Sequence, residues 1–301
     1  MLLKSYAGDL EYARRLVRSF ARFNTDGVTL FVVVPAKDLA LFLPLGSTQV
    51  TVLSEHDLEQ HLVDHEVHGM RSGYINQEIV KLSFWELGLA ANYFCVDSDA
   101  EFIRPFDRSD FMADQTTPYT VLVEDNELKV EPRYYQQYWE RRENEIRHIQ
   151  ELVGLDDPIV RTCHGHQILS AAVLRSFKED FLGPRTWTYA DALAEAPYEF
   201  SWYNMWLQKQ RTIQIHAREP LVKVFHHEGQ HLEYVIRGIT VEDIARGYLA
   251  IVVNSNYSRD LGLIPPDASK PEVLSHYLSY GEVAALLSAK ARATIRRRLG
   301  R

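Results

Sequence analysis

Apolar residues in the first third of the chain form short runs that alternate with helical patterns. Residues 1–6 begin with an apolar run that ends before Gly8. Residues 28–35 form a β-branched and aromatic run typical of a strand buried on both faces, and residues 50–53 repeat this pattern. Strands that alternate with helices predict a mostly parallel central sheet flanked by helices. The first intervening helix has one apolar face, made of Leu10, Ala13, Leu16, Val17 and Phe20.

The strongest helical pattern covers residues 74–91 and leads directly into an apolar strand that stops at Asp97, Ser98 and Asp99. Ligands of parallel α/β sheets bind outside the carboxyl ends of the strands. We therefore expect the loop at residues 6–9 to lie on the same rim as these two aspartates.

The rest of the chain predicts more helices and two further strands. Residues 162–167 open a predicted helix at 168–177, and Glu199 begins another, which is rich in aromatic residues. Strand-like runs cover residues 221–225 and 251–254. We expect one domain over residues 1–235 and a mostly helical C-terminal extension over 236–301.

Composition restricts the class of protein. The 301 residues are 46% hydrophobic and 25% charged, which suffices for a large buried core. The net charge of -8 argues against a nucleic-acid partner. Cys95 and Cys163 form no C-x-x-C pair, so neither a disulfide framework nor a cysteine zinc site is indicated. Without a signal-peptide pattern or a run long enough to span a bilayer, we expect a soluble, cytoplasmic protein.

Asp97 and Asp99 are the first candidates for chemistry. Each carboxylate disfavours ionisation of the other unless a cation lies between them, and Mg²⁺ is typically held by one or two carboxylates together with substrate phosphates. A turn with an aspartate cap is the simpler interpretation of a bare D-x-D. His56, His61 and their neighbours His65 and His68 also have metal-like spacings, but a solvated helix is the favoured interpretation there.

A longer pattern surrounds the two aspartates. Lys81-Leu82-x-x-Trp85, followed by Cys95-Val96-Asp97-Ser98-Asp99-x-x-Phe102-x-x-Pro105, resembles the helix and D-x-D strand of glycogenin-like (family 8-like) glycosyltransferases. It also resembles bacterial glycosyltransferase-like proteins of surface-polysaccharide synthesis. The resemblance implies a GT-A-like, Rossmann-type fold, a nucleotide-diphosphate sugar as donor, most often a UDP-sugar, and Mn²⁺ or Mg²⁺.

The resemblance assigns roles to single residues on the donor side. Lys81 would lie near the donor diphosphate and sugar, Asp97 near the ribose and the metal, and Asp99 would ligate the metal. Ser98, and Tyr6 and Asp9 in the first loop, would complete the nucleotide site. His226-x-x-Gly229 matches the spacing of a third metal ligand, but Leu232 replaces the lysine that follows in the family, so His227 and His231 remain alternatives.

The acceptor side is predicted less specifically. His164, Gly165 and His166 suit contact with a sugar or acceptor, although the two histidines could equally cap a helix. Glu199 resembles a carboxylate that closes the acceptor side in the bacterial relatives. It could act as a general base or accept a hydrogen bond, and it could also be only a helix N-terminal residue favoured by the dipole.

We expect a metal-dependent glycosyltransferase that moves a sugar from a nucleotide-diphosphate sugar to a saccharide or lipid-linked saccharide acceptor. The resemblance favours retention of anomeric configuration, whereas Glu199 as a base would favour inversion. A sugar nucleotidyltransferase and a non-catalytic binding module are the alternatives. The basic end of the last predicted helix, residues 280–299, suits peripheral contact with an anionic membrane or, as an alternative, a solvated helix end.

Overall fold

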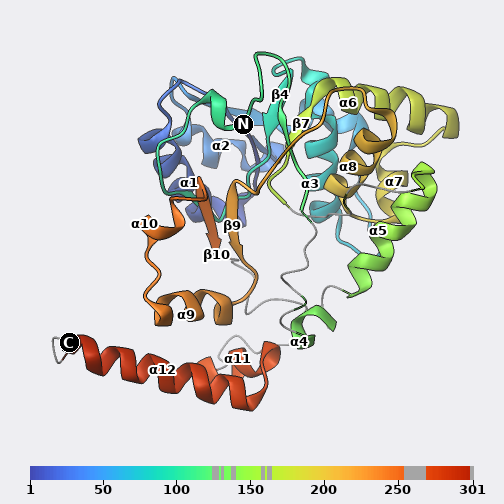
Figure 1. Ribbon diagram of the computed structural model, residues 1–301. Coiled ribbons are helices and arrows are strands. Elements are labelled where there is room, and N and C mark those ends of the chain that lie inside the picture. Colours follow the sequence, from blue (N-terminus) through green and yellow to red (C-terminus); the bar gives the residue numbers. More distant parts are fainter. Residues whose placement is uncertain are drawn as a thin grey trace.

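The protein has a mixed α/β fold in which helices surround short strands (Figure 1). Figure 1 is drawn from a computed structural model, and the structure describes residues 1–123, 129, 132–136, 140–156, 160, 165–253 and 269–298. The predicted α/β class with a parallel sheet is confirmed.

Three parallel strands form the first sheet, in the order β1-β2-β3. They are β1 (Leu2–Lys4), β2 (Leu30–Val34) and β3 (Val50–Ser54), with Leu3 opposite Val32 and Val32 opposite Val52. A parallel bridge between Leu2 and Cys95 brings the next strand, β4 (Asn92–Phe94), to the other side of β1. The N-terminal prediction is therefore confirmed, and the carboxyl end of β1 lies next to the segment that follows β4.

The first helix, α1 (Leu10–Phe23), packs against the strand that follows the two aspartates, β5 (Ala100–Phe102). Its buried residues include Ala13, Leu16 and Phe20, which belong to the predicted apolar face. The ring of Phe20 lies 6.0 Å from that of Phe102. Between β2 and β3, short helical turns surround α2 (Leu39–Phe42).

The predicted helix over residues 74–91 is confirmed over most of its length, but the prediction is wrong at the C-terminal end. The helix α3 (Ser72–Ser83) continues as a 3-10 turn, η5 (Phe84–Leu87), and stops at Gly88, whose φ is 67°. A left-handed residue breaks helical hydrogen bonding, and glycine adopts this conformation at low cost. The chain then has room to turn and enter β4.

The predicted helix over residues 168–177 is wrong in its first turn. Ile168–Ser170 form the strand β7, which pairs antiparallel with β4 and places Leu169 opposite Tyr93. The helix α6 (Ala171–Ser176) begins only after this strand. Short apolar runs fit a strand or a buried helix equally well, and here pairing with β4 decides the outcome.

A second sheet has the order β5-β10-β9. The strand β9 (Val222–Phe225) confirms the predicted run and is parallel to β10 (Ala250–Val253), which pairs antiparallel with β5. A separate parallel pair joins β6 (Tyr119–Val121) and β8 (His216–Arg218). The segment after residue 235 thus supplies a strand that lies between two strands of the preceding region.

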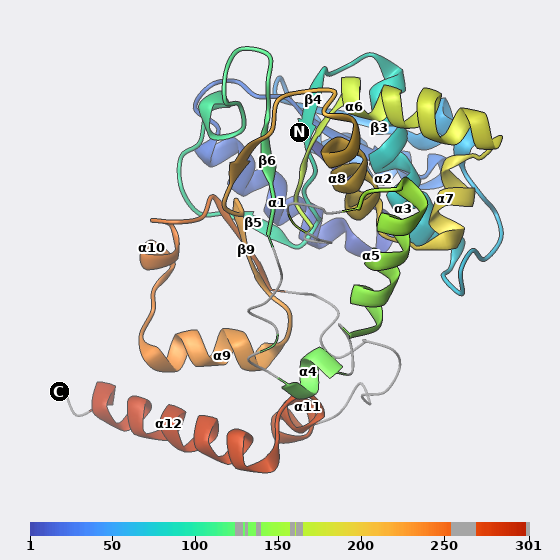
Figure 2. The same cartoon turned by 45° about the vertical axis from the view of Figure 1, so that its right-hand side comes forward.

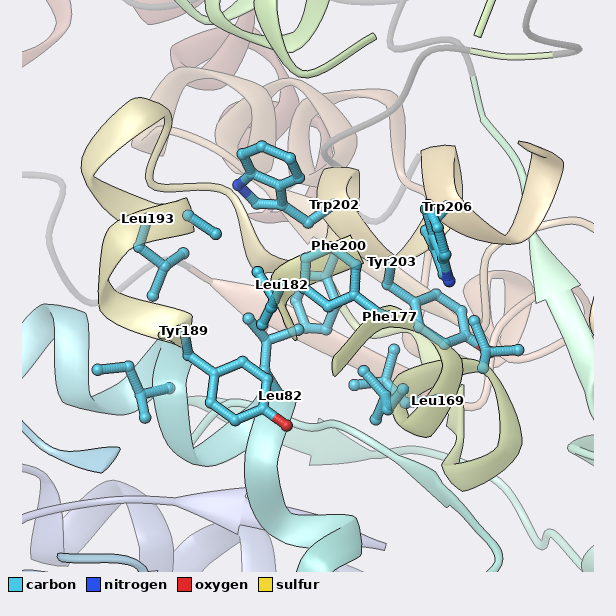
Figure 3. Close-up of a cluster of buried hydrophobic side chains, with 14 of the residues drawn as sticks. Leu82, Leu169, Phe177, Leu182, Tyr189, Leu193, Phe200, Trp202, Tyr203 and Trp206 are labelled. Carbon is cyan, nitrogen blue, oxygen red and sulfur yellow. The ribbon is translucent and has the colours of Figure 1, made fainter. Parts of the chain in front are cut away.

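Helix α8 (Glu199–Gln210) runs through the larger hydrophobic core, which buries every one of its residues from Glu199 to Gln208. Figure 3 shows Phe200, Trp202, Tyr203 and Trp206 of this helix packed with Phe177 and Leu182. Helix α7 (Tyr189–Glu195) adds Tyr189 and Leu193. Because Leu82 and Phe200 are both anchored in this core, the positions of their neighbours Lys81 and Glu199 are set by packing.

The remaining helices lie at the periphery. They are α4 (Pro132–Tyr134), α5 (Glu140–Val153), α9 (Glu228–Arg237), α10 (Val241–Ile244), α11 (Lys270–Tyr277) and α12 (Tyr280–Arg298). Figures 1 and 2 show α12 beside α9, on the side of the molecule away from the first sheet. Within the described residues, no helix combines the length and apolar character needed to cross a membrane.

Candidate functional site

Asp97 lies in the short connection between β4 and β5, beside the carboxyl end of β1. The N–H of Val96 donates to the carbonyl of Leu2 at 2.9 Å, and the N–H of Ala100 donates to the carbonyl of Asp97 at 3.1 Å. The first bond holds the segment against β1, and the second closes a turn that presents the Asp97 carboxylate. That side chain is 37% exposed.

Lys81, on α3, links this carboxylate to Glu199 at the beginning of α8. Its ammonium Nζ donates to Asp97 Oδ1 at 3.3 Å and to Glu199 Oε1 at 3.0 Å. The same ammonium lies 4.9 Å from the centre of the Phe200 ring. The side chains of Lys81 and Glu199 are only 6% and 9% exposed, so this pair is held out of water. Three segments distant in sequence therefore meet at one buried cation.

Lys81 and Asp97 each stabilise the charged form of the other. Burial by itself lowers the pKa of Lys81, but the carboxylates of Asp97 and Glu199 outweigh it and raise that pKa above its usual value. Burial works to raise the pKa of Asp97, but the charge of Lys81, followed by that of His166, lowers it. At neutral pH the site thus holds an ammonium and an ionised Asp97.

The loop after β1 reaches the same rim. Ser98 Oγ donates to Asp9 Oδ2 at 3.1 Å, which confirms the expected proximity of the first loop and the aspartates. The N–H of Ala7 donates to Asp38 Oδ2 at 2.9 Å and so fixes the start of this loop. Tyr6 is 49% exposed, which leaves its ring available to a ligand. Of the predicted nucleotide-site residues, Asp9, Ser98 and Asp97 are therefore adjacent.

Gly165 and His166 also meet Asp97, from the segment that precedes β7. His166 Nε2 lies 3.5 Å from Asp97 Oδ2. Burial lowers the pKa of His166, so its imidazole is neutral at about pH 7 and the contact is not an ion pair there. A Cβ added to Gly165 would lie 4.0 Å from Asp97 Oδ2. His164 lies outside the described residues.

His226 follows β9 and belongs to a different set of contacts. Its N–H donates to Gln230 Oε1 at 2.8 Å, and its ring centre lies 5.9 Å from that of Tyr134. The ring of His227 also faces Tyr134, at 5.2 Å, and His231 packs on Phe225. Over the described residues, no three His, Cys, Asp or Glu side chains are grouped to hold a metal ion. The role of His226, or of its two alternatives, as a third ligand stays a prediction.

A family model described as "Family of unknown function (DUF6492)" matches residues 2–232. The chain belongs to this family. The match contains Asp9, Lys81, Asp97 and Glu199, and it ends within α9.

No curated protein matches the chain. Among solved structures, the apo form of mouse xyloside xylosyltransferase 1 is similar, with 11% sequence identity and a TM-score of 0.46. The match covers 85% of this chain and 97% of that one. A similarity at this level decides neither the fold family nor the function.

The donor atoms at the rim suit a hard divalent cation that shares its ligands with a substrate. Magnesium is usually bound through one or two carboxylates plus phosphate oxygens, and it is seldom enclosed by protein ligands alone. Asp97 and Asp99 supply two carboxylates, and both are partly exposed. Such a site needs no third protein ligand, so these residues fit the metal that the resemblance implies.

Glu78 is a buried acid of this site that the sequence analysis missed. It lies one helical turn before Lys81, on the same face of α3, and is 2% exposed. Burial, followed by the charge of Glu199, raises its pKa well above the usual value and so favours its protonated form. Within the described structure its Oε2 has no hydrogen-bond partner. The sequence signal was an acid three residues before Lys81 in the strongest predicted helix, which also contains Glu86.

The four N-terminal histidines have separate partners. His56 pairs with Glu59, His61 with Glu86, His65 with Asp64 and His68 with Glu145, at 2.6, 3.0, 3.2 and 3.3 Å. No two of these histidines share a partner.

Proposed function

We propose that this protein is a metal-dependent glycosyltransferase that uses a nucleotide-diphosphate sugar. One observation carries the proposal: the buried ammonium of Lys81 lies between Glu199 and an aspartate of the D-x-D sequence. The resemblance of this lysine and these aspartates to glycogenin-like enzymes supports the same conclusion.

The distribution of charge accounts for a metal requirement. Asp97 and Glu199 lie beside the ammonium of Lys81, and Asp9 and Asp99 add two further carboxylates to the same rim, so the rim would repel a bare diphosphate. A bound divalent cation would neutralise part of this charge and stabilise the leaving diphosphate. Lys81 contributes a second cation that is already in place and desolvated, and so needs no reorganisation during the reaction.

The other residues take roles that follow from their positions. Asp97 Oδ2 lies beside His166, and the Asp97 side chain is partly exposed, so Asp97 would accept a bond from the ribose or bind the metal. Asp99 would bind the metal, with His226 as a further ligand. Tyr6 would stack on the base, while Asp9 and Ser98 would hold the sugar of the nucleotide. These residues would together form the donor side of the site.

The acceptor would enter from the side of Glu199, Gly165 and His166, with His164 in the same segment. We propose a saccharide acceptor, free or lipid-linked, in the synthesis of a bacterial surface polysaccharide at the cytoplasmic side of the membrane. Retention of anomeric configuration is the proposed outcome, with a UDP-sugar as donor. Anomeric NMR signals of the product test this point, since Glu199 acting as a general base would give inversion.

Thermal unfolding with nucleoside diphosphates, with and without Mn²⁺, tests the donor site. We expect one diphosphate to stabilise the protein only when the metal is present, by about 3 kcal/mol at a hundredfold excess over its dissociation constant. Asp97→Asn should abolish this stabilisation. Asp64→Asn, a change of the same type at a fully exposed aspartate, should not. Absence of stabilisation by every nucleotide tested would contradict the proposal.

Product analysis separates the transferase from its alternatives. Release of a nucleoside diphosphate supports glycosyl transfer, whereas pyrophosphate would identify a nucleotidyltransferase. Binding that persists in Asp97→Ala and Asp99→Ala, with no turnover of any sugar nucleotide, would indicate a non-catalytic binding module.

A further inference from the structure

The C-terminal helix α12 has an uncompensated positive charge. Six Lys and Arg residues and no Asp or Glu follow Glu282. Residues 1–282 contain the other 27 Lys and Arg residues and all 41 Asp and Glu, a net charge of -14. The molecule therefore combines a strongly acidic body with one basic helix.

Four basic side chains of α12 lie exposed on its surface. Within the described part of the chain, none of Lys290, Arg292, Arg296 and Arg298 forms an ion pair, and all four are exposed. Some arginines on other helices do form ion pairs, since Arg147 pairs with Glu143 and Arg237 with Glu233 one turn away. The positive charge of these four side chains is thus exposed to solvent.

The two faces of α12 differ in character. Val283 is buried and Leu286 and Leu287 are half-buried on the face toward α9 and α11, which α12 contacts. At about 100° per residue, Tyr280, Ala284, Ala291 and Ile295 lie within about 60° of one another on a neighbouring face, and Tyr280 lies about 20° from Leu287. Tyr280 is 84% exposed and Ile295 is 55% exposed. On the helical wheel Arg298 lies at the edge of this apolar stripe where Tyr280 lies, and Arg292 and Arg296 lie about 60° and about 100° beyond Ile295.

We propose that this outer face of α12 docks on a bilayer surface that contains anionic lipids. Exposed apolar side chains together with several exposed arginines suit a helix that lies on a membrane surface. The 19 residues of α12 form a rod about 28 Å long, at 1.5 Å per residue, which can lie flat on such a surface.

The negative charge of residues 1–282 favours an orientation in which α12 faces the membrane and the rest of the molecule points away from it. An anionic surface attracts α12 and repels the rest of the chain, so one side of the molecule faces the lipid. Figures 1 and 2 show that side free of other elements, because α9 and α11 lie on the inner side of α12. A second copy of this acidic chain would also attract the arginines but would leave Tyr280 and Ile295 unexplained.

Co-sedimentation of the full chain with vesicles tests the inference. We expect binding to phosphatidylcholine vesicles that contain phosphatidylglycerol, no binding to phosphatidylcholine alone, and weakening by salt. Arg292→Glu combined with Arg296→Glu should weaken binding at least about 20-fold, since each basic residue contributes roughly fivefold. Ile295→Ser should weaken it further.

The control is a double variant with the same change in charge on another face. Arg14→Glu combined with Arg18→Glu alters exposed residues of α1 and should leave vesicle binding within a factor of two to three of the unchanged chain. Equal loss in both double variants, or no binding of the unchanged chain to anionic vesicles, overturns the inference. Dimers that the α12 variant disrupts, without vesicle binding, would identify a second copy as the occupant and overturn it too.

The inference is independent of the proposed reaction. Stabilisation by a nucleoside diphosphate with Mn²⁺ should be unchanged in the α12 variants, because residue 292 lies beyond the family match and none of the site contacts involves α12. Failure of the nucleotide test and failure of the vesicle test are therefore distinguishable.

Discussion

The side chain of Lys81 is the residue on which the candidate site depends. It connects Asp97 and Glu199, which are 102 positions apart in the printed sequence, through bonds of 3.3 and 3.0 Å. A buried ammonium is tolerated because these two carboxylates compensate the loss of hydration. Removal of the cation would leave Glu199 buried without this partner.

Lys81→Met should lower the free energy of unfolding by about 3 to 5 kcal/mol and abolish transfer, because it breaks a buried ion pair. Urea denaturation measures the first effect and donor turnover the second. Lys209→Met, at an exposed lysine of α8, should cost less than about 1 kcal/mol. Equal losses in the two variants would contradict the structural role of Lys81.

Compared with the unchanged chain, Glu78→Gln should have a higher free energy of unfolding at about pH 8 than it has at about pH 4. The difference between variant and unchanged chain is therefore expected to depend on pH. In the folded state the pKa of Glu78 is raised, so the unfolded chain loses its proton first and stability falls as pH rises from about 4.5 toward the folded pKa. Glutamine has no such proton to lose. Thermal unfolding at the two pH values measures the difference, and Glu101→Gln, at an exposed acid of β5, should show none.

At the scale of elements, a polar network ties η5 to its surroundings. Glu86 accepts bonds from Lys178 at 2.6 Å and Tyr189 at 2.8 Å, and it pairs with His61 at 3.0 Å. Burial opposes ionisation, but these three partners lower the pKa of Glu86 to about 2. The network fixes the end of the helix that carries Lys81.

Glu86→Gln should lower the free energy of unfolding by about 1 to 2 kcal/mol at about pH 7. This is less than the full pKa shift would give, because solvent screens part of the network. The pKa is depressed in the folded state, so its contribution is present above about pH 4.5 and disappears as pH falls toward 2. Denaturation at both ends of this range measures it. A loss that does not depend on pH would point to packing instead.

The helices and strands also differ in how well the sequence predicted them. The helices α1 and α8 and the strand β9 were predicted because their own residues carry the pattern. The first turn of the helix predicted at 168–177 was wrong because Ile168 and Leu169 pair with β4, which no local pattern reveals. Gly88 ended α3 early through its left-handed conformation.

At the scale of the whole molecule, β10 joins the C-terminal segment to the sheet of the preceding region. It lies between β5 and β9, and Leu249, Ala250 and Val252 are buried there. The boundary predicted near residue 235 thus separates a strand from its two neighbours in the sheet. Without β10 the edges of β5 and β9 would both be open.

A chain that ends at residue 235 should therefore lose its cooperative thermal transition and aggregate. A chain that ends at residue 268 keeps β10 and should unfold cooperatively, with less helical signal. Circular dichroism on heating compares the two. A sharp transition in the shorter chain would instead support residues 1–235 as an independent domain.

The sequence by itself determined the alternation of strands and helices, the rim at Asp97 and Asp99, and the basic end of the last helix. Each of these depends on neighbours along the chain, through local periodicity, the turn after a strand, or the absence of nearby acids. Only the tertiary structure decided that Lys81 lies between Asp97 and Glu199, that Glu78 is buried beside them, and that His166 faces Asp97. These contacts join distant segments, and the packing of the core sets their distances.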